Sequence, residues 1–370
     1  MALRGDGLFI GLMSGTSTDG VDGVLVDLDT AGRPGCLASV SLDMPPALRA
    51  ELLALNQPGD NELARGSLAA NALADLYAQA VRQLLKDSGA TASEVRAIGA
   101  HGQTVRHNPA QGYTIQINAP ARLAEQTGIA VVSDFRSRDI AAGGQGAPLV
   151  PAFHAWLFGT SRSLAVVNLG GIANVSLLHP GQPTTGFDTG PANMLLDAWT
   201  QRHTGRSFDQ DGAWAAGGIS HPGLLRHLME SEPWLRQAPP KSTGRDLFNM
   251  AWLEQRLSSF GAALAAQDVQ ATLQSLTAHT VAQAIRDWGG KIEEVVLCGG
   301  GALNGGLVGE LESLLPCPVS LSNDHGVGVQ QMEAVAFAWL ARAHVLHAPG
   351  NLAAVTGARG ERILGCLYPA

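Results

Sequence analysis

Apolar and polar residues follow one another along this chain in blocks that predict strands and turns near its start. From Leu8 to Leu28, two apolar runs flank a loop of glycine, serine and threonine, which predicts a strand, a loop and a second strand. The pattern returns at residues 163–178, where "SLAVVNLGGIANVSLL" places a glycine turn between two apolar runs. Two hairpins of this kind indicate a duplicated architecture, which the weak similarity between their sequences does not establish.

Longer apolar patterns predict helices between and after these hairpins. Apolar residues recur at helical spacing over residues 63–89 and 272–290, which end in Ser-Gly and Gly-Gly, and residues 332–346 are mostly apolar. Shorter apolar runs within residues 95–107 and 293–307 predict buried strands that enter glycine-containing loops. Strands that alternate with helices predict an α/β fold.

The length of 370 residues is typical of two domains. We expect their boundary near residue 135, with a cleft between two α/β lobes. The predicted N-terminal lobe comprises residues 1–134 with a C-terminal return over 347–370, and the predicted C-terminal lobe comprises residues 135–346.

The charge, the apolar runs and the cysteines limit the kinds of partner that the protein could bind. The net charge is 24 − 32 = −8, which argues against a nucleic-acid-binding protein because such a protein needs a basic face. A few local cations would still suffice for an anionic substrate. No apolar run approaches the roughly twenty residues of a membrane span, and the run Leu8–Met13 is short for the core of a signal peptide. The four cysteines form no CxxC pair, which argues against a disulfide scaffold or a zinc site. We therefore expect a cytoplasmic protein without a membrane partner.

Glycine accounts for 45 of the 370 residues and gathers beside apolar runs, as expected where the backbone comes close to a ligand. Three such loops, Ser14–Gly20, Gly170–Asn174 and Gly299–Asn304, could close their backbone N–H groups around phosphate oxygens. One loop of this kind is more often a simple turn, but three in one chain favour a nucleotide site. The chain lacks the GxxxxGK[ST] motif of P-loop proteins, and "GGGALNG" misplaces the third glycine of a dinucleotide fingerprint.

Two phosphate hairpins and a late glycine loop resemble the arrangement of the actin–hexokinase–Hsp70 superfamily. Within it, a series of motifs in order over nearly the whole chain resembles the anhydro-N-acetylmuramic acid kinase family. The motifs are GLMSGTSTDGVD (11–22), HGQTVRH (101–107), SDFRSRDIAAGGQGAPLVPAFH (133–154), NLGGIANVS (168–176), GFDTGPANMLLD (186–197), PPKSTGRDLFN (239–249), LCGGGALN (297–304) and VTGAR (355–359).

The resemblance implies both a fold and a reaction. The implied fold is α/β and two-lobed, with ribonuclease H-like duplicated lobes around a central cleft, and the implied assembly is a homodimer. The implied reaction uses ATP with Mg²⁺ and water to open 1,6-anhydro-N-acetylmuramic acid and to phosphorylate O6, giving N-acetylmuramic acid 6-phosphate and ADP during peptidoglycan recycling. Such a reaction needs a base for water, a phosphate clamp and a metal.

The resemblance also implies roles for individual residues. Asp188 is the expected base, although an aspartate before a helix is, taken alone, more often a helix cap. Asp19 is expected to order the water shell of Mg²⁺. The expected ATP-binding residues are Ser14, Gly15, Thr16, Ser17, Thr18, Asp19, Gly20, Val21, Gly170, Gly171, Asn174, Gly299, Gly300, Gly301 and Asn304. The expected sugar-binding residues are His101, Gln103, Thr104, Asp134 and Arg136.

Several alternatives stay open at this point. Either Arg136 or Arg138 could bind the lactyl carboxylate of the sugar, and His101 could be a structural histidine. Lys241, Ser242 and Arg245 could form a flap over the cleft or a solvated loop, and Glu333 has no evident role. A kinase for another amino sugar and a binding ATPase of the Hsp70 or actin type are the alternative functions.

Overall fold

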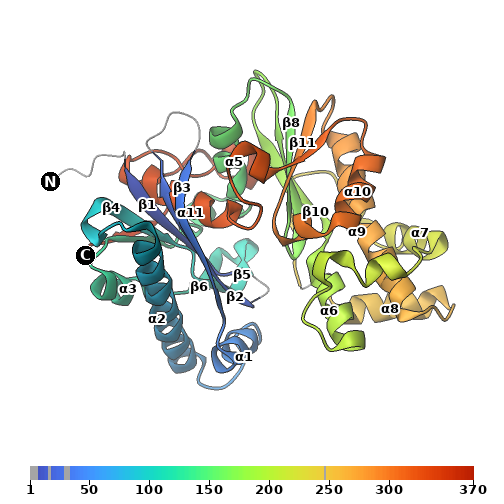
Figure 1. The fold of residues 1–370 in the computed structure, drawn as a ribbon, viewed down its shortest axis with the longest axis horizontal. Helices are drawn as coiled ribbons and strands as arrows, with labels where there is room; N and C mark the ends of the chain where they lie inside the picture. The colour runs from blue at the N-terminus through green and yellow to red at the C-terminus, as the bar shows by residue number, and fades with distance from the viewer. Residues whose placement is uncertain (1–6, 16–17, 29–33, 246) are drawn as a thin grey trace. The chain divides into compact units, whose positions relative to one another are not determined.

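The computed structural model describes residues 7–15, 18–28, 34–245 and 247–370. The chain divides into two compact units, one formed by Met1–Phe158 with Gln331–Ala370 and the other by Gly159–Gln330 (Figure 1). Each unit contains a mixed β-sheet and several helices, which confirms the prediction of an α/β fold.

The sheet of the first unit has the strand order β13-β7-β4-β1-β2-β3 in the described chain. β1, β2 and β3 form an antiparallel meander, β4 and β7 run parallel to β1, and β13 closes the edge antiparallel to β7. A separate hairpin is made by β5 and β6. The strands are β1 (Leu8–Met13), β2 (Gly20–Asp27), β3 (Gly35–Asp43), β4 (Val95–Ala100), β5 (Gln103–Asn108), β6 (Tyr113–Ile117), β7 (Val131–Ser133) and β13 (Cys366–Tyr368).

Two helices cover the opposite faces of this sheet because alternate strand residues point to opposite sides. α2 buries Leu73, Tyr77 and Leu84 in one cluster with Ile10 and Ile98, and it ends at a left-handed glycine (Figure 1). α11 packs on β1 and β4. The helices of this unit are α1 (Pro46–Ala54), α2 (Glu62–Ser88), α3 (Pro120–Thr127), α4 (Ser137–Ala141), α5 (Val150–Phe158), α11 (Met332–Val345) and α12 (Ala353–Thr356), with short 3₁₀ turns η1 (Ala92–Glu94) and η2 (Pro109–Gln111).

The sheet of the second unit has the order β10-β9-β8-β11-β12 in the described chain. Its strands are β8 (Leu164–Leu169), β9 (Ile172–Leu178), β10 (Thr185–Pro191), β11 (Glu294–Cys298) and β12 (Val319–Leu321). The helices are α6 (Asn193–Thr204), α7 (Pro222–Glu230), α8 (Met250–Phe260), α9 (Ala266–Trp288) and α10 (Gly305–Leu314). The 3₁₀ turns are η3 (Gln210–Gly212), η4 (Ala215–Gly217), η5 (Pro233–Arg236), η6 (Gly300–Leu303) and η7 (Ser322–His325).

The two sheets share one topology. In each, three consecutive strands form an antiparallel meander, and two later strands are added parallel to the first, so that β3-β2-β1-β4-β7 corresponds to β10-β9-β8-β11-β12. The duplicated architecture that the two hairpins indicated is therefore present in strand order and direction. Sequence similarity need not survive in such a duplication, because many apolar residues can fill equivalent positions in a core.

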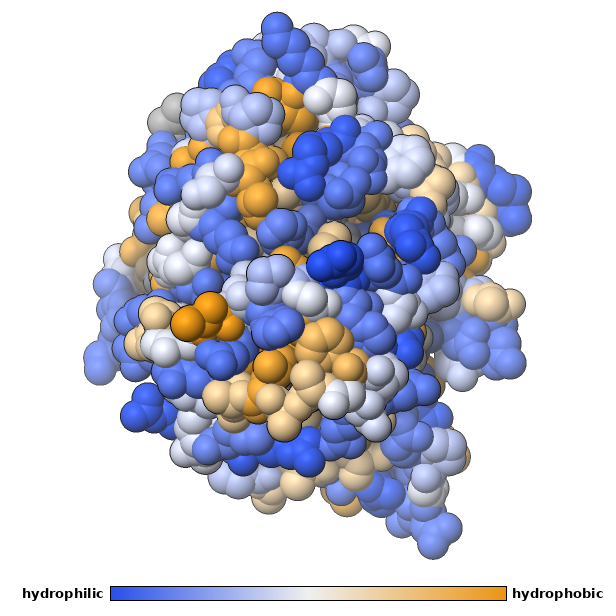
Figure 2. Space-filling model, turned by 90° about the vertical axis from the view of Figure 1, so that its right-hand side faces the viewer, coloured by the Kyte–Doolittle hydropathy of each residue, from blue (hydrophilic) through white to orange (hydrophobic). Residues whose placement is uncertain are grey.

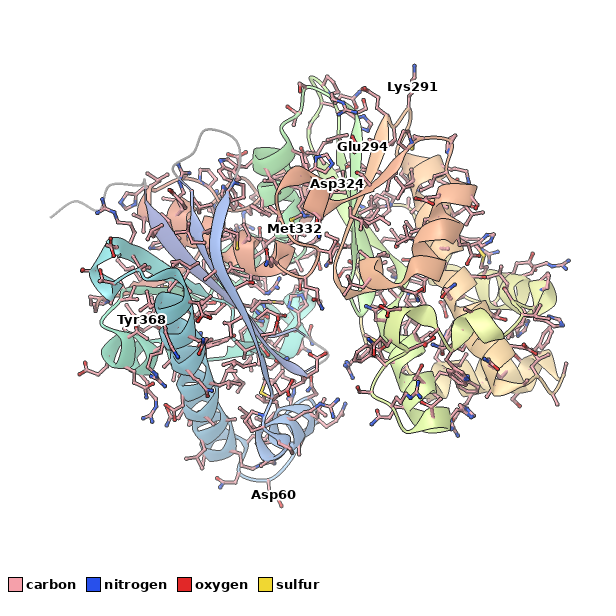
Figure 3. The ribbon with its side chains drawn as sticks, viewed as in Figure 1. Asp60, Lys291, Glu294, Asp324, Met332 and Tyr368 are labelled. Carbon is pink, nitrogen blue, oxygen red and sulfur yellow. The ribbon has the colours of Figure 1, made fainter. Side chains whose placement is uncertain are left out.

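The division of the chain differs from the expected boundary near residue 135. That position lies inside the first unit, where β7 pairs with β4 and α5 follows. Met332, labelled in Figure 3, begins α11, which the expected boundary assigned to the second lobe. The helix belongs to the first unit because the first sheet offers it a closely fitting surface.

Gly11 of β1 and Gly99 of β4 create that surface. The two glycines are register partners, and a Cβ at either position would overlap the backbone of α11, at Ala334 and Phe337 respectively. We expect Gly99→Ala to lower the free energy of unfolding by about 3 kcal/mol, because neither backbone can withdraw without disturbing the core. Urea unfolding of the two proteins measures the difference.

Gly35→Ala is the matched control for this prediction. Gly35 also lies in a strand of the same sheet, but its added Cβ would have no neighbour closer than 3.8 Å. A change of less than about 0.5 kcal/mol is expected there. Equal effects of the two substitutions would show that close approach of α11 does not explain the glycine at 99.

The described surface carries small apolar patches among polar residues, as Figure 2 shows for one face. Exposed large apolar side chains of the second unit include Phe208 and Ile219. Among the described residues, no helix combines the length and the apolar character that crossing a membrane requires.

Candidate active site

In the first unit, the loop after β1 is tied to the start of β5 by side-chain hydrogen bonds. The buried Ser14 hydroxyl bonds to Gln103 Oε1, and Gln103 Nε2 donates to the carbonyl of Gly15 over 3.0 Å. Ser14 Oγ also lies 3.2 Å from the carbonyl of Gly20, at the far end of the loop. The structure thus brings together Ser14, expected at phosphate, and Gln103, expected at the sugar.

The other residues expected in this loop have different environments. Thr18 is buried with a left-handed backbone (φ 57°), and its N–H donates to Gly15 over 3.1 Å. Asp19 is exposed, whereas the side chain of Val21 lies in the core, so that Val21 presents only its backbone to a ligand. Thr16 and Ser17 lie outside the described residues.

His101, at the end of β4, is paired with Arg136. Nε and one terminal nitrogen of the guanidinium lie 3.2 and 2.9 Å from His101 Nε2, which must therefore accept. Burial, and secondarily the charge of Arg136, lowers the pKa of His101 to about 3, so the imidazole is neutral. Its ring packs 4.7 Å from that of Phe337.

Arg136 is held from several sides. It donates to the carbonyl of Gly146 over 2.8 Å, and burial lowers its pKa to about 10 against the opposing charges of Glu333 and Asp139. Glu333, whose role was open, is therefore an electrostatic neighbour of Arg136. Arg138 is exposed in α4, and its side chain makes no hydrogen bond or ion pair with the described residues, which distinguishes the two arginine candidates.

The fully buried Asp139 was missed by sequence reasoning. Its carboxylate accepts hydrogen bonds from the N–H of Gly146 (2.7 Å), from Asn351 (2.6 Å) and from Thr356 (2.7 Å). It thereby orders the turn whose Gly146 carbonyl binds Arg136. Asp139 lies within the motif "SDFRSRDIAAGGQG" and its partner Thr356 within "VTGAR", and the fold brings these two motifs into contact.

The remaining sugar candidates lie at the edges of this group. Thr104 accepts a hydrogen bond from Gln116 Nε2 over 3.2 Å. Asp134 is exposed with a left-handed backbone (φ 61°), and it accepts a hydrogen bond from Ser137. Both retain groups for further hydrogen bonds.

In the second unit, the β8–β9 turn is supported by the start of α6. The carbonyl of Gly170 accepts the N–H of Asn193 over 3.0 Å, and that of Gly171 accepts the N–H of Met194 over 3.1 Å. Asn193 Nδ2 also donates to Leu169 over 3.0 Å. These bonds occupy the carbonyls of the turn, whereas the N–H groups of Gly170 and Gly171 have no acceptor among the residues that the structure describes.

Polar side chains form a row across this sheet beside the glycine turn. Asn168 of β8 is in register with Asn174 of β9, which is in register with Asp188 of β10. Register partners share a face of the sheet, so the three side chains lie side by side. Asn174 Oδ1 is buried and has no hydrogen-bond partner in the described part of the chain. Sequence reasoning placed Asn174 with the phosphate turn and overlooked Asn168.

Asp188 sits where β10 carries a bulge, and it is bound by a distant loop. Asp188 Oδ2 accepts hydrogen bonds from Ser242 Oγ (3.1 Å) and from the N–H of Thr243 (2.9 Å). Burial raises its pKa to about 6, while these two bonds and the charge of Lys241 act in the opposite direction. The carboxylate is thus ionised at neutral pH and basic enough to take a proton. Among the described helices, Asp188 caps none through a hydrogen bond, and the N-cap of the following helix α6 is Ala192.

The late glycine loop packs against the β8–β9 turn. Gly299 has a positive φ of 83°, which side chains rarely adopt, and a Cβ there would overlap Asn168. Asn304 caps α10 by accepting the N–H of Leu307 over 3.1 Å, and Gly212 of η3 packs directly on the Asn304 side chain. Both glycine loops and Asp188 therefore lie at one end of one sheet.

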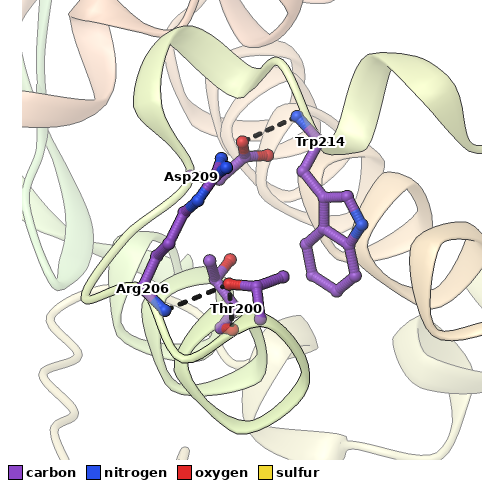
Figure 4. Close-up of a pocket in the computed structure, with 5 residues that line it drawn as sticks. Thr200, Arg206, Asp209 and Trp214 are labelled. Atoms are coloured by element: carbon purple, nitrogen blue, oxygen red, sulfur yellow. Dashed lines mark hydrogen bonds between the residues drawn. The ribbon is translucent and has the colours of Figure 1, made fainter.

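A pocket of about 170 Å³ lies beside η3 (Figure 4). It is lined by Thr200, Thr204, Arg206, Asp209 and Trp214. Asp209 accepts the N–H groups of Trp214 (2.8 Å) and Ala215 (2.9 Å), so its carboxylate orders the loop. None of the expected site residues lines this pocket.

The chain resembles known proteins over nearly all its length. Residues 7–370 match the family described as anhydro-N-acetylmuramic acid kinase. A protein of that name from Bordetella parapertussis is 64% identical over 364 residues, covering 98% of this chain and 96% of the relative. Another from Variovorax paradoxus is 56% identical over 375 residues, covering 98% and 99%.

The fold also has a counterpart among solved structures. Component A of (R)-2-hydroxyglutaryl-CoA dehydratase from Acidaminococcus fermentans superposes with a TM-score of 0.50 at 12% identity, covering 92% of this chain and 99% of that one. At this identity the likeness concerns the fold alone. Together with the two sheets of matching strand order, it agrees with the expected duplicated α/β fold. The sequence matches, in contrast, extend over nearly the whole chain at high identity, and the chain belongs to the anhydro-N-acetylmuramic acid kinase family.

Proposed function

We propose that this protein uses ATP and water to convert 1,6-anhydro-N-acetylmuramic acid into N-acetylmuramic acid 6-phosphate and ADP, in the recycling of peptidoglycan fragments. Membership of the family supports the reaction. The observation that carries the mechanism is the environment of Asp188. Within the described parts of the chain, the two hydrogen bonds to its carboxylate end on Oδ2, which leaves Oδ1 to take a proton.

The proposed chemistry proceeds through one ring opening and one phosphoryl transfer. Asp188 accepts a proton from a water molecule while the water oxygen bonds to the anomeric carbon, and the bond from that carbon to O6 breaks. The freed O6 attacks the γ-phosphorus, and the bond between this phosphorus and the bridging oxygen of ADP breaks. A carboxylate pKa of about 6 suits the base, since the group is ionised at neutral pH but retains proton affinity.

We assign ATP to the glycine loops. The N–H groups of Gly170 and Gly171 would hold phosphate beside Asn174, and Gly299, Gly300, Gly301 and Asn304 would lie along adenosine. Ser14, Gly15, Thr18, Asp19, Gly20 and the Val21 backbone would contact the outer phosphates. The exposed carboxylate of Asp19 suits a hydrated Mg²⁺, which would neutralise phosphate charge.

We assign the sugar to the group around Arg136. Its guanidinium would bind the lactyl carboxylate, and His101, Gln103, Thr104 and Asp134 would hydrogen-bond to the sugar. The neutral His101 supports this role, because its Nε2 accepts hydrogen bonds from Arg136 and so fixes the orientation of the guanidinium.

We further propose a cytoplasmic homodimer. ATP is available in the cytoplasm, and four free thiols suit a reducing compartment. The homodimer rests on the family resemblance.

The test is ADP release by the wild-type protein with Mg²⁺-ATP and one of three sugars. We expect turnover with 1,6-anhydro-N-acetylmuramic acid and at least about 100-fold less with N-acetylmuramic acid or N-acetylglucosamine, because the two latter offer no anhydro bridge to open. Equal turnover of a sugar without the bridge would indicate a general amino-sugar kinase. ADP release that no sugar stimulates would indicate a binding ATPase.

A further inference from the structure

The loop segment Lys241–Thr243 contacts Asp188 at three points, although more than fifty residues separate them in the chain. The Lys241 carbonyl accepts the N–H of Asp188 over 3.2 Å. The hydroxyl of Ser242 and the N–H of Thr243 then donate to Asp188 Oδ2. One segment therefore holds both the backbone and the carboxylate of the proposed base, and we call it the clamp segment.

The clamp segment is anchored through the Lys241 ammonium group. Lys241 Nζ donates to the carbonyl of Leu235 over 2.9 Å and lies 4.4 Å from the centre of the Trp234 ring. A cation above an indole face is attracted by the ring quadrupole. Lysine occurs at only three positions in the chain, 86, 241 and 291, so this anchor uses a residue type that the sequence otherwise seldom employs.

The anchor is itself fixed in the helical part of the second unit. The N–H of Trp234 donates to Glu232 Oε1 over 3.1 Å, and the buried Glu232 accepts from Trp252 Nε1 (2.9 Å) and Arg256 (3.2 Å) through Oε2. The Trp234 ring also packs edge-on against Phe248, 5.7 Å away. Glu232, Trp234 and α8 thus give Lys241 a rigid attachment.

We propose that Lys241 is a positioning residue, which holds the clamp segment so that Asp188 presents Oδ1 to the attacking water. This inference rests on the proposed function and deepens it. This role takes the place of the two alternatives for this segment, a flap over the cleft and a solvated loop. A flap would bond to the substrate, whereas the clamp segment bonds to Asp188. Ser242 and Thr243 act through hydrogen bonds to Oδ2, so that, as far as the described residues show, Oδ1 stays available.

The charges around the clamp define the expected pH dependence. Lys241 is the charged group acting on Asp188, and Lys241 in turn faces Asp188 and Asp287 of α9. The bonds from Ser242 and Thr243 and the Lys241 charge all favour the ionised carboxylate. Loosening the clamp should therefore raise the pKa of the base, and the acid limb of the activity profile should move to higher pH.

The experiment compares Lys241→Met, Lys241→Arg and Ser242→Ala with the wild type, by ADP release with the anhydro sugar between pH 5 and 9. Methionine keeps a long stem but removes the charge and the bond to Leu235. We expect Lys241→Met to lower kcat about 30-fold, to leave both KM values within about threefold, and to move the acid limb up by about one pH unit. Arginine retains the charge above Trp234, so Lys241→Arg should restore kcat to within about fivefold of the wild type.

Lys291→Met is the matched control, since Lys291 is exposed in the same unit (Figure 3), and we expect wild-type kinetics. Ser242→Ala removes one bond to Asp188 and leaves the anchor intact, so it tests the clamp even if Lys241→Met does not fold. A Lys241→Met protein with an unmoved acid limb, or with a raised KM and unchanged kcat, would overturn the positioning role. A wild-type protein without turnover of the anhydro sugar would instead overturn the proposed function.

Discussion

Replacing Asp188 with asparagine is expected to lower kcat about 10³-fold while leaving the KM for ATP within about threefold. An amide cannot take the proton of the attacking water, and general-base catalysis of this kind typically contributes factors of about 10² to 10⁴. The asparagine oxygen can still accept the hydrogen bonds from Ser242 and Thr243, so the loop and the sheet should keep their places. ADP release under saturating substrates measures kcat, and thermal unfolding verifies the fold.

Asp268→Asn is the matched control for this substitution. Asp268 lies in the same unit and accepts the N–H of Ile219 over 2.8 Å, a bond that asparagine can also accept. Its kcat should stay within about twofold of the wild type. A loss of less than tenfold in Asp188→Asn would exclude Asp188 as the base.

The pH profile provides a second readout of the same residue. Burial raises the pKa of Asp188 to about 6, and the base must be ionised, so wild-type kcat should rise as pH increases through about 6 and then level off. The residual activity of Asp188→Asn should lack this limb. A limb that persists unchanged in the variant would assign the titration to another group.

Replacing Arg136 with methionine is expected to raise the KM for 1,6-anhydro-N-acetylmuramic acid about 100-fold. Hydrogen bonds between charged groups contribute roughly 1.5 to 3 kcal/mol, which corresponds to about 10- to 150-fold in binding. Arg138→Met should change this KM by less than about twofold, because Arg138 is exposed and is not paired with His101.

A sugar without the lactyl group distinguishes the loss of carboxylate binding from a general disturbance of the site in Arg136→Met. Arg136 also holds His101 and the Gly146 carbonyl, so its loss could disturb the site in general. With 1,6-anhydro-N-acetylglucosamine, which lacks the lactyl carboxylate, the wild type and Arg136→Met should differ by less than about fivefold in kcat/KM. Equal losses of kcat/KM with both sugars would show that Arg136 stabilises the site but does not bind the lactyl carboxylate.

Several of these residues could be named before the fold was known, because their patterns are local. Apolar periodicity predicted α2 almost to its ends and α9 apart from residues 266–271, since one helix face buries its residues every three to four positions. A mostly apolar run predicted α11. Glycine turns between apolar runs predicted both hairpins. The motif around Asp188 also identified the expected base, because that motif is a continuous stretch of the chain which resembles a known family.

Other features depended on contacts between distant segments. Asn174 belongs beside Asp188 because strand register places them opposite each other. Asp139 bonds to Asn351 across 212 residues, and the Lys241–Thr243 segment reaches Asp188 across more than fifty. No local pattern specifies such partners, since they are set by strand order and loop path.

The sequence by itself determined the family, the α/β class and most helix and strand positions. It also identified the motifs whose residues are expected to bind ATP and the sugar. Only the tertiary structure decided that α11 covers the first sheet, that Asn168, Asn174 and Asp188 form one row, and that the Lys241–Thr243 segment bonds to Asp188. The physical reason is the separation along the chain of the residues that interact. Secondary structure follows from patterns within a few turns or residues, whereas packing and hydrogen-bond partners depend on where the folded chain returns.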